Sequence, residues 1–379
     1  MNFEYTEDQL LIQEEARKFA EEVIAKDVKE RDEHAKFPKE IIKEMGELGY
    51  LGMLVPEEWG GAEFDTVSYA LAMEEFSRVD ASVGVICSVT NSLACYSLLT
   101  FGTDEQKEKY LRPLAEGEGI GAFALSEANA GSDAVSLKCT AEDKGDHFLL
   151  NGEKMWITSA ENADVFIVFA RSEAVKGSKG ITAFIVEKGL EGFSIEKKED
   201  KMGLRGSDTC PIVFNNVKVP KENVLGERGK GFSVAMSLLD GGRIGIASQA
   251  IGIARACLEE SVAYAKEREQ FGTAIASFQA IQFKIAQMAT KIESTRLLIH
   301  KAATLRDQKK TVGSVASMAK WMASETAMWC AEQAIQIHGG YGYTKDYNVE
   351  RYFRDAKVTE IYEGTSQVQQ IVIAREYLK

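Results

Sequence analysis

Near its end the 379-residue chain reads Thr359-Glu360-Ile361-Tyr362-Glu363-Gly364-Thr365-Ser366. One carboxylate, Glu363, follows two bulky side chains and stands before a glycine that lets the main chain approach a ligand closely. A carboxylate held between apolar neighbours has a raised pKa, which suits a general base near neutral pH. The same residues also fit an exposed loop glutamate beside a helix N-cap, because Thr365 and Ser366 are common capping residues. The stretch alone leaves both interpretations open.

The residues on either side of this stretch have helical spacing. Residues 367–377 predict a short helix with its apolar side chains on one side. Upstream, three patterns cover residues 232–268, 278–305 and 313–337, and each exceeds the average helix of about 11 residues. Three long helices and a terminal one predict a C-terminal four-helix bundle.

The first third of the chain is also helical, whereas the middle third has the pattern of strands. Capping boxes at Thr6 and Thr103 mark two helix starts. An Asn-Gly pair inside residues 148–157 predicts a β-hairpin, since this pair is the strongest short-range hairpin signal. The other predicted helices cover residues 38–48, 68–78 and 84–101, and the other strands cover residues 120–125, 165–170, 181–186 and 212–214.

The predicted fold class is therefore α+β, with three domains in sequence order. An N-terminal α-helical domain covers residues 1–115, a central β domain residues 116–230, and the four-helix-bundle domain residues 231–379.

The composition is that of an ordinary globular protein, with 45% hydrophobic and 27% charged residues. No apolar run approaches the length of about 20 residues that spans a bilayer, and the chain begins with no signal peptide. We therefore expect a cytoplasmic protein without membrane insertion. A formal net charge of -13 argues against nucleic acid as a partner. The six cysteines and four histidines lack metal-ligand spacing, so we expect no metal.

A longer stretch, Arg354-Asp355-Ala356-Lys357-Val358 followed by the residues quoted first, resembles the C-terminal signature of the acyl-CoA dehydrogenases. The order of helices, strands and helices is similar to that family as well, so the resemblance covers essentially the whole chain. It implies an FAD-dependent enzyme that removes two hydrogens from an acyl-CoA thioester. It also implies that Glu363 is the base that takes the α-proton while the β-hydrogen passes to the flavin as hydride.

The same resemblance implies the residues of the flavin site. Ala128 stands where most relatives have proline, which implies a looser turn beside this site. Arg268 and Gln279 reach the flavin of a neighbouring subunit in relatives, which implies a homo-oligomer, in relatives a tetramer. The implied cofactor-binding residues are Phe123, Leu125, Ser126, Gly131, Ser132, Trp156, Ile157, Thr158, Arg268, Gln279, Gln336, Gly339, Gly340, Thr365, Ser366 and Gln367.

For the substrate, the resemblance implies that the main-chain N–H of Glu363 and a flavin hydroxyl hold the thioester oxygen. In two branches of the family the base lies at the position of Gly242, so glycine there leaves Glu363 without a rival. Electron-transferring flavoprotein reoxidises the flavin in this family. The implied substrate-binding residues are Ser132, Asp240, Arg243, Tyr362 and Gly364.

Resemblance also guides the choice of acyl group. Residues 81–103 contain no Lys, Arg or His, which disfavours a dicarboxylic substrate. The sequence resembles short-chain (butyryl-CoA) members best, and branched or cyclic acyl groups remain alternatives. Asn91 is either a pocket residue or an inter-helix hydrogen-bonding group. An acyl-CoA oxidase and a non-enzymatic acyl-CoA-binding scaffold are the alternatives from other functional classes.

Overall fold

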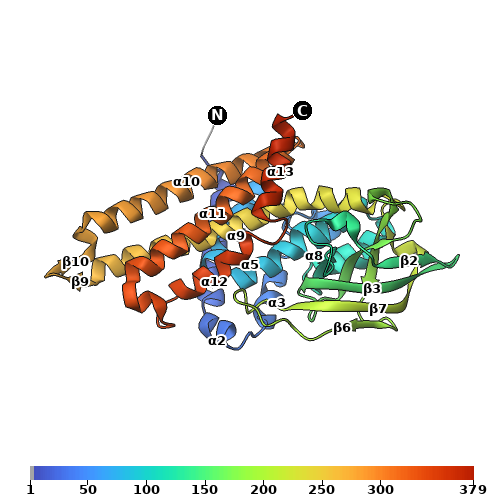
Figure 1. Cartoon of the computed structure of the whole chain (residues 1–379), viewed down its shortest axis with the longest axis horizontal. Helices are drawn as coiled ribbons and strands as arrows, with labels where there is room; N and C mark the ends of the chain where they lie inside the picture. Colours follow the sequence, from blue (N-terminus) through green and yellow to red (C-terminus); the bar gives the residue numbers. More distant parts are fainter. Residues whose placement is uncertain (1–3) are drawn as a thin grey trace.

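The computed structural model describes residues 4–379, which form an elongated molecule (Figure 1). Helices occupy the chain up to Ala115, a sheet lies between Gly121 and Leu225, and helices return from Gly231. The predicted order of helices, strands and helices is confirmed. The boundaries 1–115, 116–230 and 231–379 remain our proposal.

The N-terminal helices begin and end largely where the sequence predicts. Both capping boxes form, at Thr6 and at Thr103. The helices are α1 (Glu7–Phe19, continued by the π-helical turn Ala20–Ile24), α2 (Val28–Glu33), α3 (Lys39–Glu47), α4 (Thr66–Val79), α5 (Ala81–Ser88), α6 (Tyr96–Phe101), α7 (Asp104–Gln106) and α8 (Arg112–Ala115).

The expectation that no apolar run has membrane-spanning length is wrong for one helix. From Ala81 to Phe101, α5 and α6 join through the π-helical segment Val89–Cys95 into 21 residues that are long and apolar enough to cross a membrane. However, 83% of the window that meets this test is buried inside the protein. Burial of that extent is what the core helix of a globular domain has.

The central part is a twisted sheet with the order β6-β7-β3-β2-β4-β5-β8, and β1 pairs in parallel with β4. Two strands, β3 and β7, are much longer than the rest and pair antiparallel along most of their length. The strands are β1 (Gly121–Ala124), β2 (Thr140–Asp143), β3 (His147–Thr158), β4 (Val165–Arg171), β5 (Ile181–Glu187), β6 (Phe193–Ile195), β7 (Thr209–Pro220) and β8 (Val224–Leu225).

The predicted hairpin around Asn151-Gly152 is wrong. β3 continues straight through this pair, and the register against β7 shifts between Leu150 and Gly152, so the two residues form a β-bulge. Gly152 has φ +134°, and a Cβ there would lie 2.9 Å from the Cα of Cys139 on the preceding segment. The glycine is needed for this close approach of two strands rather than for a turn.

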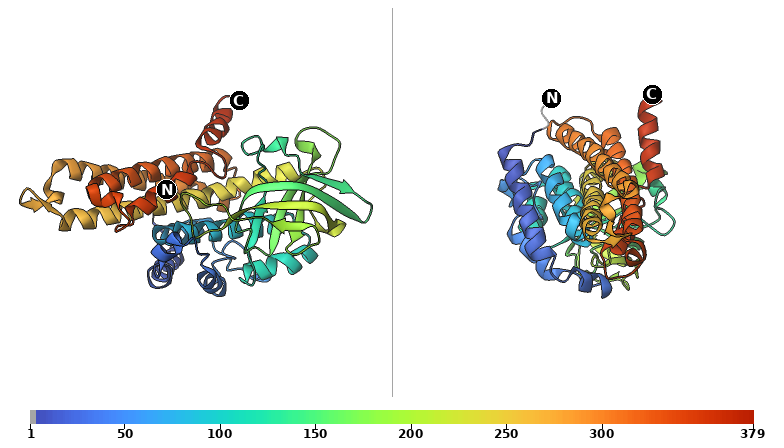
Figure 2. Two further views of the ribbon diagram at one scale, coloured as in Figure 1. Left: turned by 60° about the horizontal axis from the view of Figure 1, so that its bottom comes forward. Right: turned by 90° about the vertical axis from the view of Figure 1, so that its left-hand side faces the viewer.

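The C-terminal part consists of α9 (Gly231–Glu267), α10 (Gln279–Asp307), α11 (Gly313–His338), α12 (Val349–Thr359) and α13 (Ser366–Tyr377), with the short hairpin β9 (Glu269–Gln270) and β10 (Thr273–Ala274) after α9. The three long helices and the terminal helix are confirmed. The helix α12, which the sequence analysis did not assign, packs on α9 and α11. Figure 2 shows α13 projecting away from the long helices.

The helix α9 organises the whole molecule. Its 37 residues extend for about 55 Å at a rise of about 1.5 Å per residue. At its start Gly231 lies against β5, since a Cβ there would be 2.6 Å from the main-chain nitrogen of Ala183. Further along, α9 packs on α4, α10 and α11, and its last residue precedes β9 at the far end of the molecule (Figure 1). One helix therefore joins all three parts.

Candidate functional site

The loop between α12 and α13 holds Glu363 in an uncommon conformation. The φ angles of Glu363 and Gly364 are +49° and +90°, in the left-handed region that non-glycine residues rarely occupy. The main-chain N–H of Ser366 donates to the carbonyl of Glu360 at 2.9 Å, and the Thr365 side chain caps α13 by accepting from the N–H of Val368. The predicted helix start after Gly364 is confirmed.

The Glu363 carboxylate is enclosed rather than exposed. Its Oε2 is buried and has no hydrogen-bond partner within residues 4–379. A Cβ at Gly242 on α9 would lie 2.3 Å from this oxygen, so only glycine leaves it room. Burial raises the pKa of Glu363 to about 7, although the positive charges of Lys320 and Arg243 hold it down. This environment favours the general-base interpretation over that of a solvated loop glutamate.

Two polar side chains that the sequence analysis missed hold the carbonyl groups of this loop. The Nζ of Lys320, on α11, donates to the carbonyl of Gly364 at 2.8 Å. The Nε2 of Gln369, on α13, donates to the carbonyls of Gly364 at 2.8 Å and Glu363 at 3.1 Å. Both side chains are fully buried. The sequence signal for Lys320 was a lysine within the small-residue face of α11. Burying a lysine there is costly unless its charge has a partner.

Four of the five residues predicted to bind substrate lie around the same loop, and the fifth, Ser132, is exposed on the segment that follows β1. Tyr362 donates a hydrogen bond to Oε1 of the buried Gln249, another residue that the sequence analysis missed. Asp240 and Arg243 form the expected ion pair on α9, with their side chains 2.5 Å apart. The structure thus brings Glu363, Gly364, Tyr362, Asp240 and Arg243 into one region.

Several cationic nitrogens in this region lack a protein acceptor. In the described part of the chain, neither the Nε of Arg243 nor the two terminal nitrogens of Arg306 has a hydrogen-bond partner, although all three atoms are buried. The Arg306 guanidinium lies 4.2 Å from the centre of the Tyr96 ring, beside Gly241. Buried donors without acceptors are costly, and a polar ligand beside Asp240 would satisfy them.

Asn91 is an inter-helix hydrogen-bonding residue. It is completely buried, its Nδ2 donates to the carbonyl of Tyr50 at 2.8 Å, and its Oδ1 accepts from the N–H of Met53 at 2.8 Å. Because both ends of the amide are used within the N-terminal part, Asn91 is not free to contact an acyl group.

The predicted flavin residues between Phe123 and Ser132 and those between Trp156 and Thr158 meet near the ends of β1 and β3. The N–H of Met155 on β3 donates to the carbonyl of Ser126 at 2.9 Å. A bulge between Lys154 and Ile157 turns Trp156 to φ +58° and leaves its side chain 53% exposed. An exposed indole on a strained bulge presents a flat apolar face to a ligand. The Ile157 side chain lies in the sheet core, so only its main chain could contact a flavin.

A buried ion pair supports this segment. The Nζ of Lys154 donates to Oε1 of Glu127 at 2.8 Å and to the carbonyl of Leu125 at 3.2 Å. Glu127 also exchanges two main-chain hydrogen bonds with Ala130, which close the turn that contains Ala128. Beyond it Ser132 is exposed, and a Cβ at Gly131 would meet nothing within 4 Å. The turn implied to be loose is therefore closed, and the surface beyond it is open.

The third predicted group lies at the opposite end of the molecule, beside β9 and β10 (Figure 1). Arg268 follows Arg243 along α9 by roughly 25 residues, or about 38 Å of helix. The members of this group, all of them exposed, are Arg268, Gln279, Gln336, Gly339 and Gly340. A Cβ at either Gly339 or Gly340 would meet nothing within 4 Å. One chain does not bring this group to Trp156.

The residues from Thr365 to Gln367 at the start of α13 form the last predicted flavin group. Thr365 is half-buried, and its hydroxyl caps the helix. Ser366 is buried, whereas Gln367 is exposed. The Oγ of Ser366 has no partner among the residues that the structure describes.

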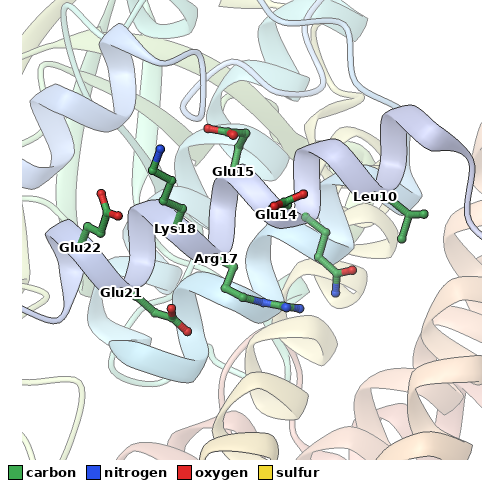
Figure 3. A pocket seen from close by; sticks show the side chains of 8 residues that line it. Leu10, Glu14, Glu15, Arg17, Lys18, Glu21 and Glu22 are labelled. Atoms are coloured by element: carbon green, nitrogen blue, oxygen red, sulfur yellow. The ribbon is translucent and has the colours of Figure 1, made fainter.

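A hollow of about 650 Å³ lies along α1 (Figure 3). Its wall consists of Leu10, Gln13, Glu14, Glu15, Arg17, Lys18, Glu21 and Glu22. None of the predicted site residues belongs to it, and its wall is a solvated helix face. Within residues 4–379, no group of three or more His, Cys, Asp or Glu side chains is arranged to hold a metal ion.

Comparison with known proteins agrees with this geometry over the whole chain. Models of the acyl-CoA dehydrogenase N-terminal, middle and C-terminal domains match residues 6–118, 122–217 and 229–378. A curated relative, the 3-(aryl)acrylate reductase of Clostridium sporogenes, is 51% identical over 99% of this chain and 100% of its own length. The chain belongs to the acyl-CoA dehydrogenase family.

Solved structures of the family are equally similar. Butyryl-CoA dehydrogenase from Megasphaera elsdenii has 47% identity and a TM-score of 0.98, with 100% of both chains covered. A chain described as "Electron transferring flavoprotein of Acidaminococcus fermentans: Towards a mechanism of flavin-based electron bifurcation" has 50% identity and a TM-score of 0.99, again with 100% of both chains covered. The predicted family, fold and enzyme class are confirmed.

As an acyl-CoA dehydrogenase the protein is a flavin-dependent oxidoreductase, and its cofactor is FAD. The residues present fit this cofactor. The exposed Trp156 on its bulge and the open surface at Gly131 offer an apolar face and close main-chain approach in one part of the chain. Arg268 offers donors suited to a diphosphate in another part. Family membership also argues against a non-enzymatic scaffold.

Proposed function

We propose that the protein catalyses α,β-dehydrogenation of a short-chain saturated acyl-CoA, with Glu363 as the base that removes the α-proton. The buried and unpartnered Oε2 of Glu363 against Gly242 carries this proposal. The raised pKa of Glu363, to about 7, keeps a substantial fraction of the carboxylate ionised near neutral pH and makes it a stronger base than a solvated glutamate. FAD, when bound, supplies the acceptor for the β-hydrogen.

The α-proton of a thioester is weakly acidic, so the site must stabilise the enolate-like charge that develops on the thioester oxygen. No residue in the described part of the chain accepts from the main-chain N–H of Glu363. This N–H is available to donate to the thioester oxygen, and it belongs to the same residue as the carboxylate that takes the proton. The α-proton moves to Glu363, the β-hydrogen leaves with its electron pair, and the α,β double bond forms.

A short acyl group is supported by the face of α9 behind Glu363. On this face Gly242 is followed by Gly245 and then Gln249, about one and two turns further along. A Cβ at Gly245 would lie 2.3 Å from the hydroxyl of Tyr69, so a buried phenol already fills that space. Gln249 closes the next turn through hydrogen bonds to Tyr362 and to the carbonyl of Ala81.

Branched and cyclic acyl groups remain alternatives. The name of the Clostridium sporogenes relative adds an aryl-substituted substrate and the reductive direction. The residues proposed here serve both directions, because a base that accepts the α-proton also returns it. The closed space behind Gly242 favours the smaller straight-chain group over an aryl group.

We further propose an oligomer in which a second copy completes the flavin site. The roughly 38 Å between Arg268 and Arg243 along α9 supports this arrangement, since one FAD cannot lie at both ends. Phe271, between β9 and β10, is 96% exposed, and Ile371 on α13 is 50% exposed. These exposed apolar side chains are available for contact with a second copy. The predicted tetramer is the proposed assembly.

Electron-transferring flavoprotein is the proposed redox partner, and an oxygen-consuming oxidase is the alternative. The structural neighbour described as an electron transferring flavoprotein supports the first. The proposed cytoplasmic location remains a prediction from the sequence.

Anaerobic spectral titration tests the proposed reaction. Purified protein with its FAD is titrated with straight acyl-CoAs from four to twelve carbons and with isobutyryl-, cyclohexanoyl- and 3-phenylpropanoyl-CoA. Bleaching of the flavin band at the lowest concentration with butyryl-CoA is expected. Tighter bleaching with an aryl, cyclic or branched thioester would keep the reaction and replace the acyl group. In a separate aerobic assay, rapid oxygen consumption during turnover would favour the oxidase.

A further inference from the structure

The left-handed turn at Glu363 requires support from other elements. A non-glycine residue with φ near +50° costs about 1–2 kcal/mol relative to a right-handed conformation. The turn also directs the carbonyls of Glu363 and Gly364 into the protein, where each needs a donor. The only hydrogen bond within the loop that spans the turn is that from Ser366 to Glu360 among the described residues.

Lys320 supplies the main external support. It lies on α11 with none of its surface exposed, and the residues near it on the buried face of that helix are alanines such as Ala316 and Ala323. Its Nζ reaches the carbonyl of Gly364 at 2.8 Å. A buried ammonium costs several kcal/mol unless charges or acceptors compensate. A methionine would fill the same space without that cost. The presence of lysine therefore indicates that its charge and its hydrogen bond have a function.

Gln369 donates to the same carbonyl from a second helix. It is fully buried on the first turn of α13, and its Nε2 contacts both loop carbonyls. The Gly364 carbonyl therefore accepts from two different elements, α11 and α13. The two donors fix the peptide plane between Gly364 and Thr365, and the contact of Gln369 with the Glu363 carbonyl fixes the plane between Glu363 and Gly364.

We propose that Lys320, assisted by Gln369, is a positioning residue that locks the Glu363 turn, so that the carboxylate faces Gly242 and the Glu363 N–H stays free for the thioester oxygen. This inference rests on the proposed function, because it gives Lys320 a role only if Glu363 is the base. Lys320 acts through the loop, because its Nζ contacts the carbonyl of Gly364 rather than the Glu363 side chain.

The charge of Lys320 has a second effect on Glu363. The charged and titratable groups that influence Glu363 and Lys320 are Arg243 from α9, Tyr69 from α4, and Tyr362 and Glu360 from the loop itself. Burial lowers the pKa of Lys320 to about 8, opposed by the Glu363 carboxylate. Lys320 and Arg243 together keep the pKa of Glu363 from rising above about 7. Removing Lys320 leaves only one of the two cations, and the pKa of Glu363 rises further.

The test uses two variants of the FAD-loaded enzyme and one matched control. Lys320→Met removes the charge and the hydrogen bond, whereas Lys320→Gln removes the charge and keeps a donor. The control Lys357→Met removes a half-exposed lysine beside Glu360, at the end of α12. The readout is the single-turnover rate of flavin bleaching by butyryl-CoA from pH 5.5 to pH 9.5, with FAD content per chain measured alongside.

For Lys320→Met we expect the acid limb of the pH–rate profile to shift to higher pH by about 1 unit. We also expect the rate at pH 9 to fall about tenfold. For Lys320→Gln we expect the same shift of the acid limb to higher pH, with a smaller loss of rate at pH 9. Lys357→Met is expected to follow the parent enzyme, and FAD content is expected to stay unchanged in all three.

Two results would overturn the inference. One is a pH profile of Lys320→Met that coincides with the parent enzyme. The other is an equal loss of rate at every pH in both Lys320 variants, which a merely structural role would give. If Lys320→Met does not fold, Lys320→Gln decides by the position of its acid limb. Retained bleaching in Glu363→Gln would instead overturn the proposed function and this inference together.

Discussion

The two regions that α9 connects differ in how complete they are within one chain. Around Glu363, side chains from α9, α11 and α13 converge, and the carboxylate, its supporting lysine and the neighbouring ion pair are largely buried. Around Arg268, every predicted residue is exposed and open space surrounds the glycines. The first region is a finished site for chemistry, whereas the second is one side of a site that a neighbour must complete.

The difference predicts which substitutions affect chemistry and which affect cofactor binding. Residues around Glu363 should change the rate of flavin reduction without changing FAD content. Residues around Arg268 should change FAD content in a way that depends on assembly.

The largest expected effect is on Glu363 itself. Glu363→Gln keeps the size of the side chain and removes the base, so the rate of flavin bleaching should fall by about 10³-fold or more while the FAD content stays the same. Stopped-flow bleaching with butyryl-CoA measures the rate. Activity close to that of the parent enzyme would refute Glu363 as the base.

Gly242→Ala should have the next largest effect. The new methyl group would stand 2.3 Å from Oε2 of Glu363, so the carboxylate must move, and we expect about a 10²-fold lower rate at unchanged FAD content.

The matched control is Gly252→Ala on the same helix, where the methyl group would meet the carbonyl of Glu74 at 2.5 Å and strain the contact with α4. It should lower the melting temperature and leave the rate per folded molecule intact. Equal rates for the two variants would mean that Gly242 does not make room for the base.

Arg268→Ala and Trp156→Ala should each weaken FAD binding, by about tenfold, through loss of a diphosphate contact and of an apolar face. Combining the two variants in one oligomer tests whether Trp156 and Arg268 of different copies share one FAD. In a mixed oligomer of the two variants, one site of each pair joins an intact Trp156 to an intact Arg268, and the other carries both substitutions.

Random assembly after co-expression should therefore restore tight FAD binding at half of the sites in mixed pairs, which is about one quarter of all sites. FAD content after gel filtration measures it. No recovery in the mixed oligomer would mean that the two groups act on different ligands or within one chain.

The smallest expected effect is on stability. The folded pKa of Glu363 is raised to about 7, above its value in the unfolded chain, so the folded state holds the proton more tightly. The contribution of Glu363 to stability is thus greatest below about pH 4.5 and falls as the pH rises towards 7.

Glu363→Gln removes this dependence. The variant should gain stability relative to the parent enzyme between pH 5 and pH 8, by roughly 1–3 kcal/mol at the upper end. Denaturant unfolding at both pH values measures the difference. A stability difference that is the same at pH 5 and pH 8 would contradict the raised pKa.

The same two regions show what the sequence could and could not predict. Glu363, Gly364 and the Thr365 cap are neighbours in the chain, so their local order alone predicted the turn and the following helix. Lys320, Gln369 and Gln249 come from three different helices, and their approach to the loop depends on how α9, α11 and α13 pack. No local pattern contains that information.

The hairpin prediction at Asn151-Gly152 was wrong for a related reason. A turn signal describes what the backbone can adopt locally, but β7 pairs along β3 on both sides of the pair. The tertiary pairing keeps the strand continuous, and the glycine serves the close approach of Cys139 instead. The helices of the bundle were predicted well because their length leaves little room for a competing structure.

The unbroken length of α9 restricts how this protein can change over time. One residue inserted between Arg243 and Arg268 would rotate everything beyond it by about 100° and advance it by about 1.5 Å. The Arg268 end would then present a different side to the neighbouring copy while the Glu363 end stayed in place. A substitution along this helix leaves the spacing of its two ends unchanged, whereas a change in its length would uncouple catalysis from cofactor retention, so insertions are expected in loops elsewhere.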